Sequence, residues 1–137
     1  MCEVPVTTPD FYPTILEMIG LPPVPYQHSD GVIFSSLLVG REGFQRRAIF
    51  WHYPHYGNQA GRPGSSIRIG KYELIEFFED SRIELYDLEN DLSERNDISG
   101  EELGLAREMR ELLTEWRQQV EAKIPQPNPD WIDVYCT

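Results

Sequence analysis

The strongest constraint on the fold is an amphipathic segment that follows a run of short β-type segments. Its apolar side chains recur at helical spacing and fall on one side of the predicted helix: Leu103, Ala106, Met109, Leu112, Leu113, Trp116 and Val120. Ser99 and Glu102 have the spacing of a capping box, and Pro125 supplies a stop, so the pattern predicts a helix of about 22 residues. A helix with one apolar side needs a partner, and we expect it to cover one face of a sheet.

Four segments with β-type composition precede this helix. Tight turns at Gly70-Lys71 and Asp80-Ser81 join the last three into a predicted antiparallel meander. Short helices are expected at 7–20, capped by Thr8 or Asp10, and at 34–39. The predicted class is therefore α+β, with a small antiparallel sheet of about four strands, packed by the C-terminal helix. The expected strands are 47–53, 66–69, 72–79 and 82–88.

The third of these strands has apolar residues at both parities, with Leu74 and Phe78 against Ile75 and Phe77. A strand with this pattern is expected to be buried on both faces of the sheet, whereas a single helix can cover only one face. We therefore expect either a missing covering domain or a homo-oligomer formed through the exposed face. The 137 residues predict one domain: a helical and linker segment at 1–45, the sheet and helix at 46–124, and an extended tail at 125–137.

The charge distribution singles out one region. The formal net charge is −11, yet residues 41–71 carry six Lys or Arg residues against one acid, Glu42. The acidic remainder argues against general nucleic-acid binding. No apolar run approaches the roughly 18 residues of a membrane span, and no signal peptide is visible at the N-terminus. Anionic groups are attracted to the basic window.

Candidate binding residues lie inside this basic window. The stretch FWHYPHYGNQ, at 50–59, combines aromatic rings with hydrogen-bond donors in a predicted loop next to a strand. Imidazole, amide and guanidinium groups can all donate hydrogen bonds to the oxygens of an anionic group. In the alternative interpretation the aromatic residues pack at a strand end, the histidines are half-buried, and Arg68 pairs with an acid. The predicted substrate-binding residues are His52, His55, Asn58, Gln59 and Arg68.

The sequence predicts no catalytic residue and no metal ligand within the chain. Cys2 and Cys136 lie near opposite ends, so they can pair only if the termini meet, and their spacing does not suggest a metal site. Ser65 has no evident His and Asp partners for a hydrolase triad. The acidic run at 87–97 lacks the spacing of a calcium-binding EF-hand loop.

Five blocks, in this order, resemble the C-terminal part of the sulfatases, the arylsulfatase-like branch of the alkaline phosphatase superfamily. Leu92 stands where the family pattern has proline, and Glu73 stands where it has lysine. The most specific block is the one that begins with Glu84-Leu85-Tyr86-Asp87-Leu88. The blocks are TPDFYPTIL at 8–16, DG at 30–31 leading to LLVG at 37–40, FWHYPHY at 50–56, IRIGKYELI at 67–75, and ELYDLEND at 84–91 with Glu94 and Asn96.

The resemblance implies a sulfuric ester hydrolase whose catalytic groups lie in an N-terminal domain upstream of these residues. Family members use a formylglycine made from the Cys or Ser of a C/S-x-P/A-x-R motif, together with calcium. Cys2 is followed by Glu3-Val4-Pro5-Val6 and does not fit that motif. Neither cofactor is therefore expected in this chain. The expected partners are that catalytic domain and a sulfated carbohydrate or aryl sulfate, and the family suggests a periplasmic or extracellular protein.

Two other functions remain open at this level. The chain could be a stand-alone module that binds sulfated glycans or other anions, since the basic window and its aromatic residues are compatible with binding alone. It could also be a structural dimerisation domain, because the third strand expects cover on both faces.

Overall fold

The computed structural model describes residues 2–58, 61–126 and 128–129, and divides into two compact units between Arg46 and Arg47. The expected end of the N-terminal segment, at residue 45, lies one position from this division. No helix in the described part of the chain is long and apolar enough to cross a membrane.

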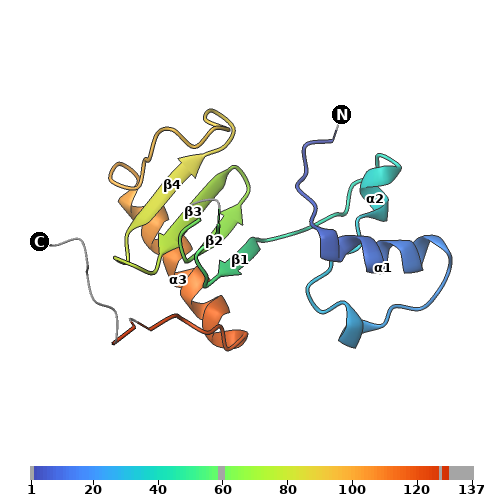
Figure 1. The fold of residues 1–137 in the computed structure, drawn as a ribbon. Coiled ribbons are helices and arrows are strands. Elements are labelled where there is room, and N and C mark those ends of the chain that lie inside the picture. Colours follow the sequence, from blue (N-terminus) through green and yellow to red (C-terminus); the bar gives the residue numbers. More distant parts are fainter. Residues whose placement is uncertain (1, 59–60, 127, 130–137) are drawn as a thin grey trace, which may run out of the picture. The chain divides into compact units, whose positions relative to one another are not determined.

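Four antiparallel strands form one sheet in the second unit, in the order β1-β2-β3-β4 (Figure 1). Gly70 turns the chain between β2 and β3 with a φ of 57°, a left-handed conformation that glycine adopts without a steric penalty. The predicted meander and the α+β class are confirmed. The strands are β1 (Ile49–Tyr53), β2 (Gly64–Ile69), β3 (Tyr72–Phe77) and β4 (Ile83–Asp87).

Helix α3 (Leu103–Gln119) runs across one face of this sheet (Figure 1). Met109 and Leu113 are fully buried against the sheet, and burial of such a side chain contributes about 1.5–3 kcal/mol. The indole of Trp116 stacks on the ring of Phe50, with the ring centroids 4.9 Å apart. The helix therefore covers one face, as its spacing predicts. The buried core consists of Ile67, Leu74, Leu85, Ala106, Met109 and Leu113.

The start of α3 corrects the predicted capping box. The N-cap is Glu102, three residues later than the predicted Ser99. The backbone N–H of Ser99 donates to Oδ1 of Asp97 (2.8 Å), and the N–H of Glu102 donates to the carbonyl of Ile98 (2.9 Å). These bonds fold the segment into a turn ahead of the helix, because the short Asp97 side chain and the Ile98 carbonyl accept from the two backbone donors that a capping box would satisfy.

The helix ends at Gln119, before the predicted stop at Pro125. Glu121 has a φ of 51°, and the N–H of Ala122 donates to the carbonyl of Arg117 (2.9 Å). This pattern is a Schellman motif, which satisfies the last carbonyls of a helix through a left-handed residue. The predicted length of about 22 residues is therefore wrong, and the observed helix has 17 residues.

The first unit contains helix α1 (Thr8–Met18), the short 3₁₀ helix η1 (Pro25–Gln27) and helix α2 (Ser35–Leu38). The two predicted short helices are confirmed, but the cap of the first is Thr7, whereas Thr8 or Asp10 was expected. Oδ2 of Asp10 accepts hydrogen bonds from the backbone N–H of Thr7 (2.6 Å) and from its hydroxyl (3.0 Å).

A buried ion pair holds this first unit together. Asp10 has no exposed surface, and the Arg46 guanidinium binds both of its carboxylate oxygens, with Nη1 2.8 Å from Oδ2. The backbone N–H of Val32 donates to Oδ1 (2.9 Å). Burial opposes ionisation, but these hydrogen bonds and those from Thr7 outweigh it and lower the pKa of Asp10 from 3.8 to about 2. The charged carboxylate thus connects α1 to segments 22 and 36 positions away.

Replacement of Asp10 by Asn should unfold the first unit, because loss of one partner of a buried ion pair costs about 3–5 kcal/mol. Hydrogen exchange of α1 peptides, compared with α3 peptides, measures the loss. In the wild type, the depressed pKa means that the stabilisation is present above about pH 4 and is lost as the pH falls towards 2. The exposed Asp30→Asn change is the matched control. Unchanged α1 protection in Asp10→Asn would contradict the role of the pair.

Candidate functional site

The register of the strands assigns side chains to two faces of the sheet. Phe50 lies opposite Ile67 across β1 and β2, and both face α3, since Phe50 stacks on Trp116. The alternate residues Trp51 and Tyr53 therefore lie on the other face, which no described helix of this unit covers. We call this uncovered side of the sheet the open face.

His52 lies on the face that α3 covers. Its Nε2 is 3.1 Å from the carbonyl oxygen of Lys123, and its Nδ1 is 2.8 Å from the hydroxyl of Ser65, which is 3% exposed. In the neutral imidazole, Nε2–H donates to Lys123 and Nδ1 accepts from Ser65. Both ring nitrogens of this predicted site residue are therefore engaged in connecting β1 and β2 to the segment after α3.

Three exposed aromatic side chains of the 50–59 stretch form a row, which begins on the open face and ends just after β1. Trp51 is 44% exposed and Tyr53 is 54% exposed, although both belong to a strand. The exposed His55 follows the end of β1, and its ring makes an edge contact with Tyr53, with centroids 5.7 Å apart. Exposed aromatic rings in a row provide apolar faces with polar edges, a surface that suits a sugar ring.

Arg68 lies on the same open face as Trp51. Its strand position is a diagonal neighbour of Trp51, about 7–8 Å away in such a sheet. Its Nε donates to the carbonyl of Gly70 (3.2 Å), and its cross-strand partner is Glu73. Burial and the negative charge of Glu94 raise the pKa of Glu73, while Arg68 opposes that change. The structure thus places Arg68 beside the aromatic row and opposite an acid.

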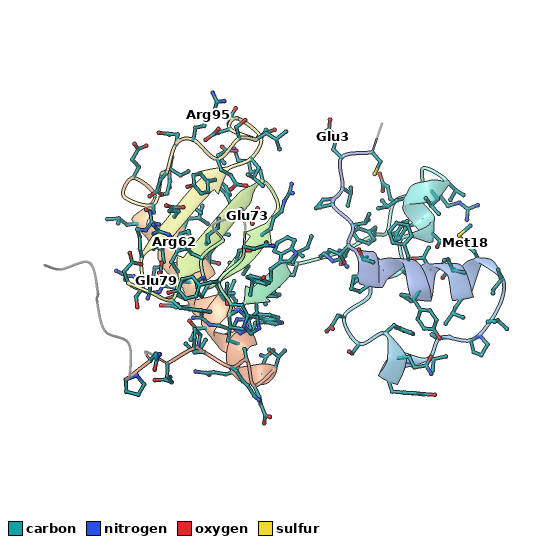
Figure 2. All side chains as sticks on the ribbon, in the orientation of Figure 1. Glu3, Met18, Arg62, Glu73, Glu79 and Arg95 are labelled. Atoms are coloured by element: carbon teal, nitrogen blue, oxygen red, sulfur yellow. The ribbon has the colours of Figure 1, made fainter. Side chains whose placement is uncertain are left out.

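The loop after β1 is fixed by Glu79, which the sequence interpretation did not include. The hydroxyl of Tyr56 donates to Oε1 of Glu79 (2.9 Å), and Nε of Arg62 lies 3.6 Å from Oε2. Arg62 and Glu79 are labelled in Figure 2. Asn58 is exposed on this loop, and Gln59 lies outside the described residues. An open hollow of about 560 Å³ adjoins the loop, with Tyr56, Phe78 and Glu79 among its lining residues.

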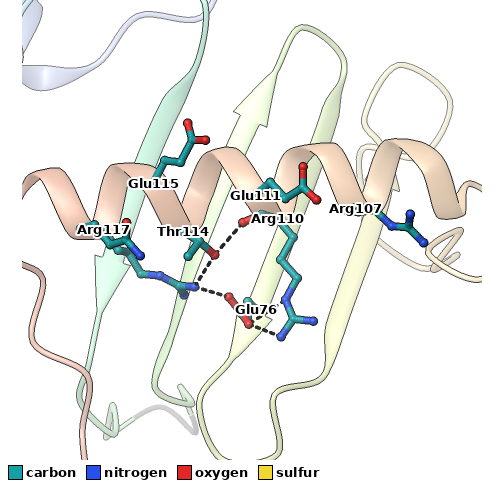
Figure 3. Close-up of a pocket in the computed structure, with 8 residues that line it drawn as sticks. Glu76, Arg107, Arg110, Glu111, Thr114, Glu115 and Arg117 are labelled. Carbon is teal, nitrogen blue, oxygen red and sulfur yellow. Dashed lines mark hydrogen bonds and ion pairs between the residues drawn. The ribbon is translucent and has the colours of Figure 1, made fainter.

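A second hollow, of about 670 Å³, lies beside α3 and contains three arginines (Figure 3). Glu76 is 6% exposed, and its Oε1 accepts from Nη2 of Arg110 at 2.7 Å. Nη2 of Arg117 lies 2.6 Å from the other oxygen, Oε2. Arg107 extends away from this cluster along the helix (Figure 3). Two guanidinium groups are therefore committed to a buried carboxylate of the fold, which would compete with any anionic ligand.

The predicted site residues are therefore only partly brought together. Arg68 shares the open face with Trp51 and Tyr53, and His55 contacts the end of this row, whereas His52 faces α3. No three His, Cys, Asp or Glu side chains gather into a metal-binding group within the described ranges. Cys2 is exposed and unpaired, and Cys136 lies outside the described residues.

The family of the chain follows from sequence comparison. Residues 3–123 match the family described as N-sulphoglucosamine sulphohydrolase, C-terminal. The chain belongs to this sulfatase family. It is 34% identical over 156 residues to a sulfatase of Formosa agariphila, an alignment that covers 95% of this chain and 28% of that protein.

Solved structures have the same fold as this sulfatase domain. BT1596, described as a 2-O GAG sulfatase, superposes with a TM-score of 0.69 at 20% identity, over 82% of this chain and 25% of its own. BT4656, solved with its substrate D-glucosamine-2-N,6-O-disulfate, has a TM-score of 0.58 at 26% identity, over 85% of this chain and 24% of its own. The sulfatase domain thus spans about a quarter of the length of these relatives.

Replacement of Glu76 by Gln should lower the free energy of unfolding by about 3 kcal/mol, because Arg117, whose side chain is 13% exposed, loses its buried counter-charge. Urea unfolding followed by tryptophan fluorescence measures the change. Glu111→Gln removes an exposed carboxylate at the same hollow and should stay within about 0.5 kcal/mol of the wild type. Equal effects of the two substitutions would show that Glu76 does not hold α3 to the sheet.

Proposed function

We propose that this chain is the C-terminal domain of a sulfatase that hydrolyses sulfate esters of carbohydrates, and that it supplies substrate-binding side chains but no nucleophile. The family match over residues 3–123 carries this proposal. The relatives are about four times as long as the matched region, so most of the enzyme is expected to lie in an additional, catalytic part.

The open face is the surface proposed to contact the sugar. Trp51 and Tyr53 are exposed strand residues whose rings can stack on a pyranose, and Arg68 can bind a sulfate group through its guanidinium. His55 adds a donor beside Tyr53. Asn58 and Gln59 remain predicted contacts from the adjoining loop. His52 is not among the proposed sugar contacts, because both of its ring nitrogens have partners within the fold.

The substrate class is proposed from the relatives. The family is described by an N-sulphoglucosamine hydrolase, and BT4656 was solved with a glucosamine that carries N- and 6-O-sulfate groups. A sulfated glucosamine combines a ring face with anionic groups, which the aromatic row and Arg68 suit. Glu73, opposite Arg68, reduces the local positive charge and favours a ligand that also offers hydroxyl or amino donors.

The two cofactors of the family do not fit the described residues. Formylglycine requires a Cys or Ser within a C/S-x-P/A-x-R motif, and Cys2 is followed by Glu3-Val4-Pro5-Val6. Calcium requires clustered oxygen ligands, and the described residues contain no such His, Cys, Asp or Glu group. We therefore propose that both belong to the catalytic part.

The purified chain should not hydrolyse a chromogenic aryl sulfate in the presence of calcium, because it has no proposed nucleophile. Release of the chromophore, compared with a blank without protein, measures this. Turnover above the blank that co-purifies with the chain would contradict the proposal that the nucleophile lies in the catalytic part, whether or not a Cys2→Ser variant retains it.

The binding residues can be tested in a chimeric sulfatase, in which this chain replaces the matched region of the Formosa agariphila enzyme. Arg68→Ala should raise KM for glucosamine-2-N,6-O-disulfate about tenfold with little change in kcat, because it removes ground-state binding. The exposed Arg95→Ala change, on the loop after β4, is the matched control and should leave KM unchanged. Equal KM values for the two variants would remove Arg68 from the site.

A further inference from the structure

The hollow beside the loop after β1 lies at the end of the sheet where β1 and β3 stop and β2 begins. Its volume of about 560 Å³ is in the range of small-molecule sites. Three segments of the second unit line it: the loop between β1 and β2, the turn after β3, and the segment that follows α3. We call it the Tyr56 hollow. Its lining includes Tyr56, Pro63, Phe78, Glu79, Pro125 and Gln126.

Two aromatic rings line the Tyr56 hollow. Tyr56 is 70% exposed, so its ring is accessible to a ligand. Phe78 is half-buried and held from two sides, since its ring centroid lies 5.5 Å from that of His52 and 5.7 Å from Cζ of Arg117. Its backbone N–H also donates to the carbonyl of Pro63 (3.0 Å). The hollow therefore combines a fixed ring with an accessible one, and aromatic rings of this kind suit a sugar ring.

Glu79 holds the polar groups of the hollow in place. The hydroxyl of Tyr56 donates to its Oε1 (2.9 Å), which raises the pKa of Tyr56, so the hydroxyl remains a neutral donor. Nε of Arg62 lies 3.6 Å from the other oxygen, Oε2. The N–H of Gly57 donates to the carbonyl of Gly61 (2.9 Å), and this bond closes the loop between Tyr56 and Arg62. Both side chains therefore reach the same carboxylate.

The charges at the hollow favour an uncharged ligand. The carboxylate of Glu79 would repel a sulfate group, and the charge of Arg62 is compensated by that carboxylate. Arg117, behind the ring of Phe78, is paired with Glu76. Carboxylate and carboxamide oxygens accept hydrogen bonds from hydroxyl groups, and the exposed Gln126 amide also donates. Hydroxyl groups on an uncharged ring match this set of partners, whereas a sulfated ring does not.

The hollow continues the aromatic row of the open face. Trp51 and Tyr53 lie on that face, His55 contacts Tyr53, and Tyr56 is the next residue of the chain. We propose that the Tyr56 hollow binds an uncharged, unsulfated sugar unit of the same oligosaccharide whose sulfated unit lies on the open face. The substrate would then be an oligosaccharide. The role in the substrate rests on the proposed function, whereas binding in the hollow can be measured without it.

NMR of the isolated, ¹⁵N-labelled chain tests the hollow directly. During titration with chitotetraose, a neutral tetramer of N-acetylglucosamine, the side-chain amide signal of Gln126 should shift and saturate. Tyr56→Ala should weaken this binding at least about tenfold, because the accessible ring is lost. Tyr26→Ala, at a tyrosine of the first unit that is 83% exposed, is the matched control and should leave the binding unchanged. A silent Gln126 signal, or equal affinities of the wild type and Tyr56→Ala, would overturn the proposal.

A second variant tests the charge selection and keeps both rings. The wild type should bind 6-O-sulfated chitotetraose at least about tenfold more weakly than chitotetraose, because the Glu79 carboxylate repels the sulfate groups. Glu79→Gln should reduce this preference, since it removes the charge and keeps the size of the side chain. Equal affinities of the wild type for the two tetramers, or an unchanged preference in Glu79→Gln, would contradict an uncharged ligand.

The chimeric sulfatase tests whether one oligosaccharide occupies both surfaces. Two substrates are compared: glucosamine-2-N,6-O-disulfate alone, and a chitotetraose in which this disulfated unit replaces one end. Tyr56→Ala should raise KM at least about fivefold for the longer substrate and should leave KM for the monosaccharide unchanged, because the monosaccharide occupies the open face alone. Equal effects on the two substrates would overturn the shared substrate.

The two assays distinguish failure of this proposal from failure of the proposed function. An inactive chimera, together with saturable binding of chitotetraose to the isolated chain, would contradict the proposed function and support the hollow as a sugar site. An active chimera, together with a silent Gln126 signal, would support the proposed function and overturn the site in the hollow.

Discussion

The attachment of α3 to the sheet depends on Glu76, a buried carboxylate that contacts the guanidinium groups of Arg110 and Arg117. The acid comes from β3 and the two arginines from positions about two turns apart on the helix, so the cluster fixes both the position and the rotation of α3. The apolar side chains of Ile67, Leu74, Met109 and Leu113 form the rest of the interface between α3 and the sheet. Because one helix of 17 residues covers one face, the other face of the sheet keeps its aromatic side chains exposed.

Each of the two units exposes a surface, for a different structural reason. In the second unit, Trp51, Tyr53 and Arg68 lie on the open face, the proposed sugar-binding surface, whereas His52 lies on the face that α3 covers. In the first unit, the buried Asp10–Arg46 pair turns the polar side of α1 inwards and the apolar side outwards. Both units thus expose surfaces that an isolated domain would normally bury, as expected for part of a larger sulfatase.

Periodic patterns in the sequence predicted the helices and strands well. They could not predict contacts between residues that are distant in the sequence. Helical spacing from Ala106 to Trp116 and the turn at Gly70 were sufficient for the helix, the meander and the class. The hairpin at Gly70 also implies that Arg68 lies opposite Glu73, because pairing proceeds outwards from the turn. The capping box at Ser99 failed because Asp97 accepts from the N–H of Ser99 and the carbonyl of Ile98 accepts from the N–H of Glu102. The Asp10–Arg46 pair spans 36 positions, and no local pattern specifies it.

We propose that a sulfated sugar binds on the open face of the sheet and not on the face under α3. Two tryptophans report on these faces, since Trp51 is exposed on the open face and Trp116 stacks on Phe50. The indole N–H signals of the ¹⁵N-labelled chain, followed by NMR during titration with glucosamine-2-N,6-O-disulfate, distinguish them. We expect a saturable shift of the Trp51 signal and no shift of the Trp116 signal. The affinity should be weak, about 1 mM, because the isolated chain forms only one wall of the proposed binding site. A silent Trp51 signal, or equal shifts of both, would contradict this proposal.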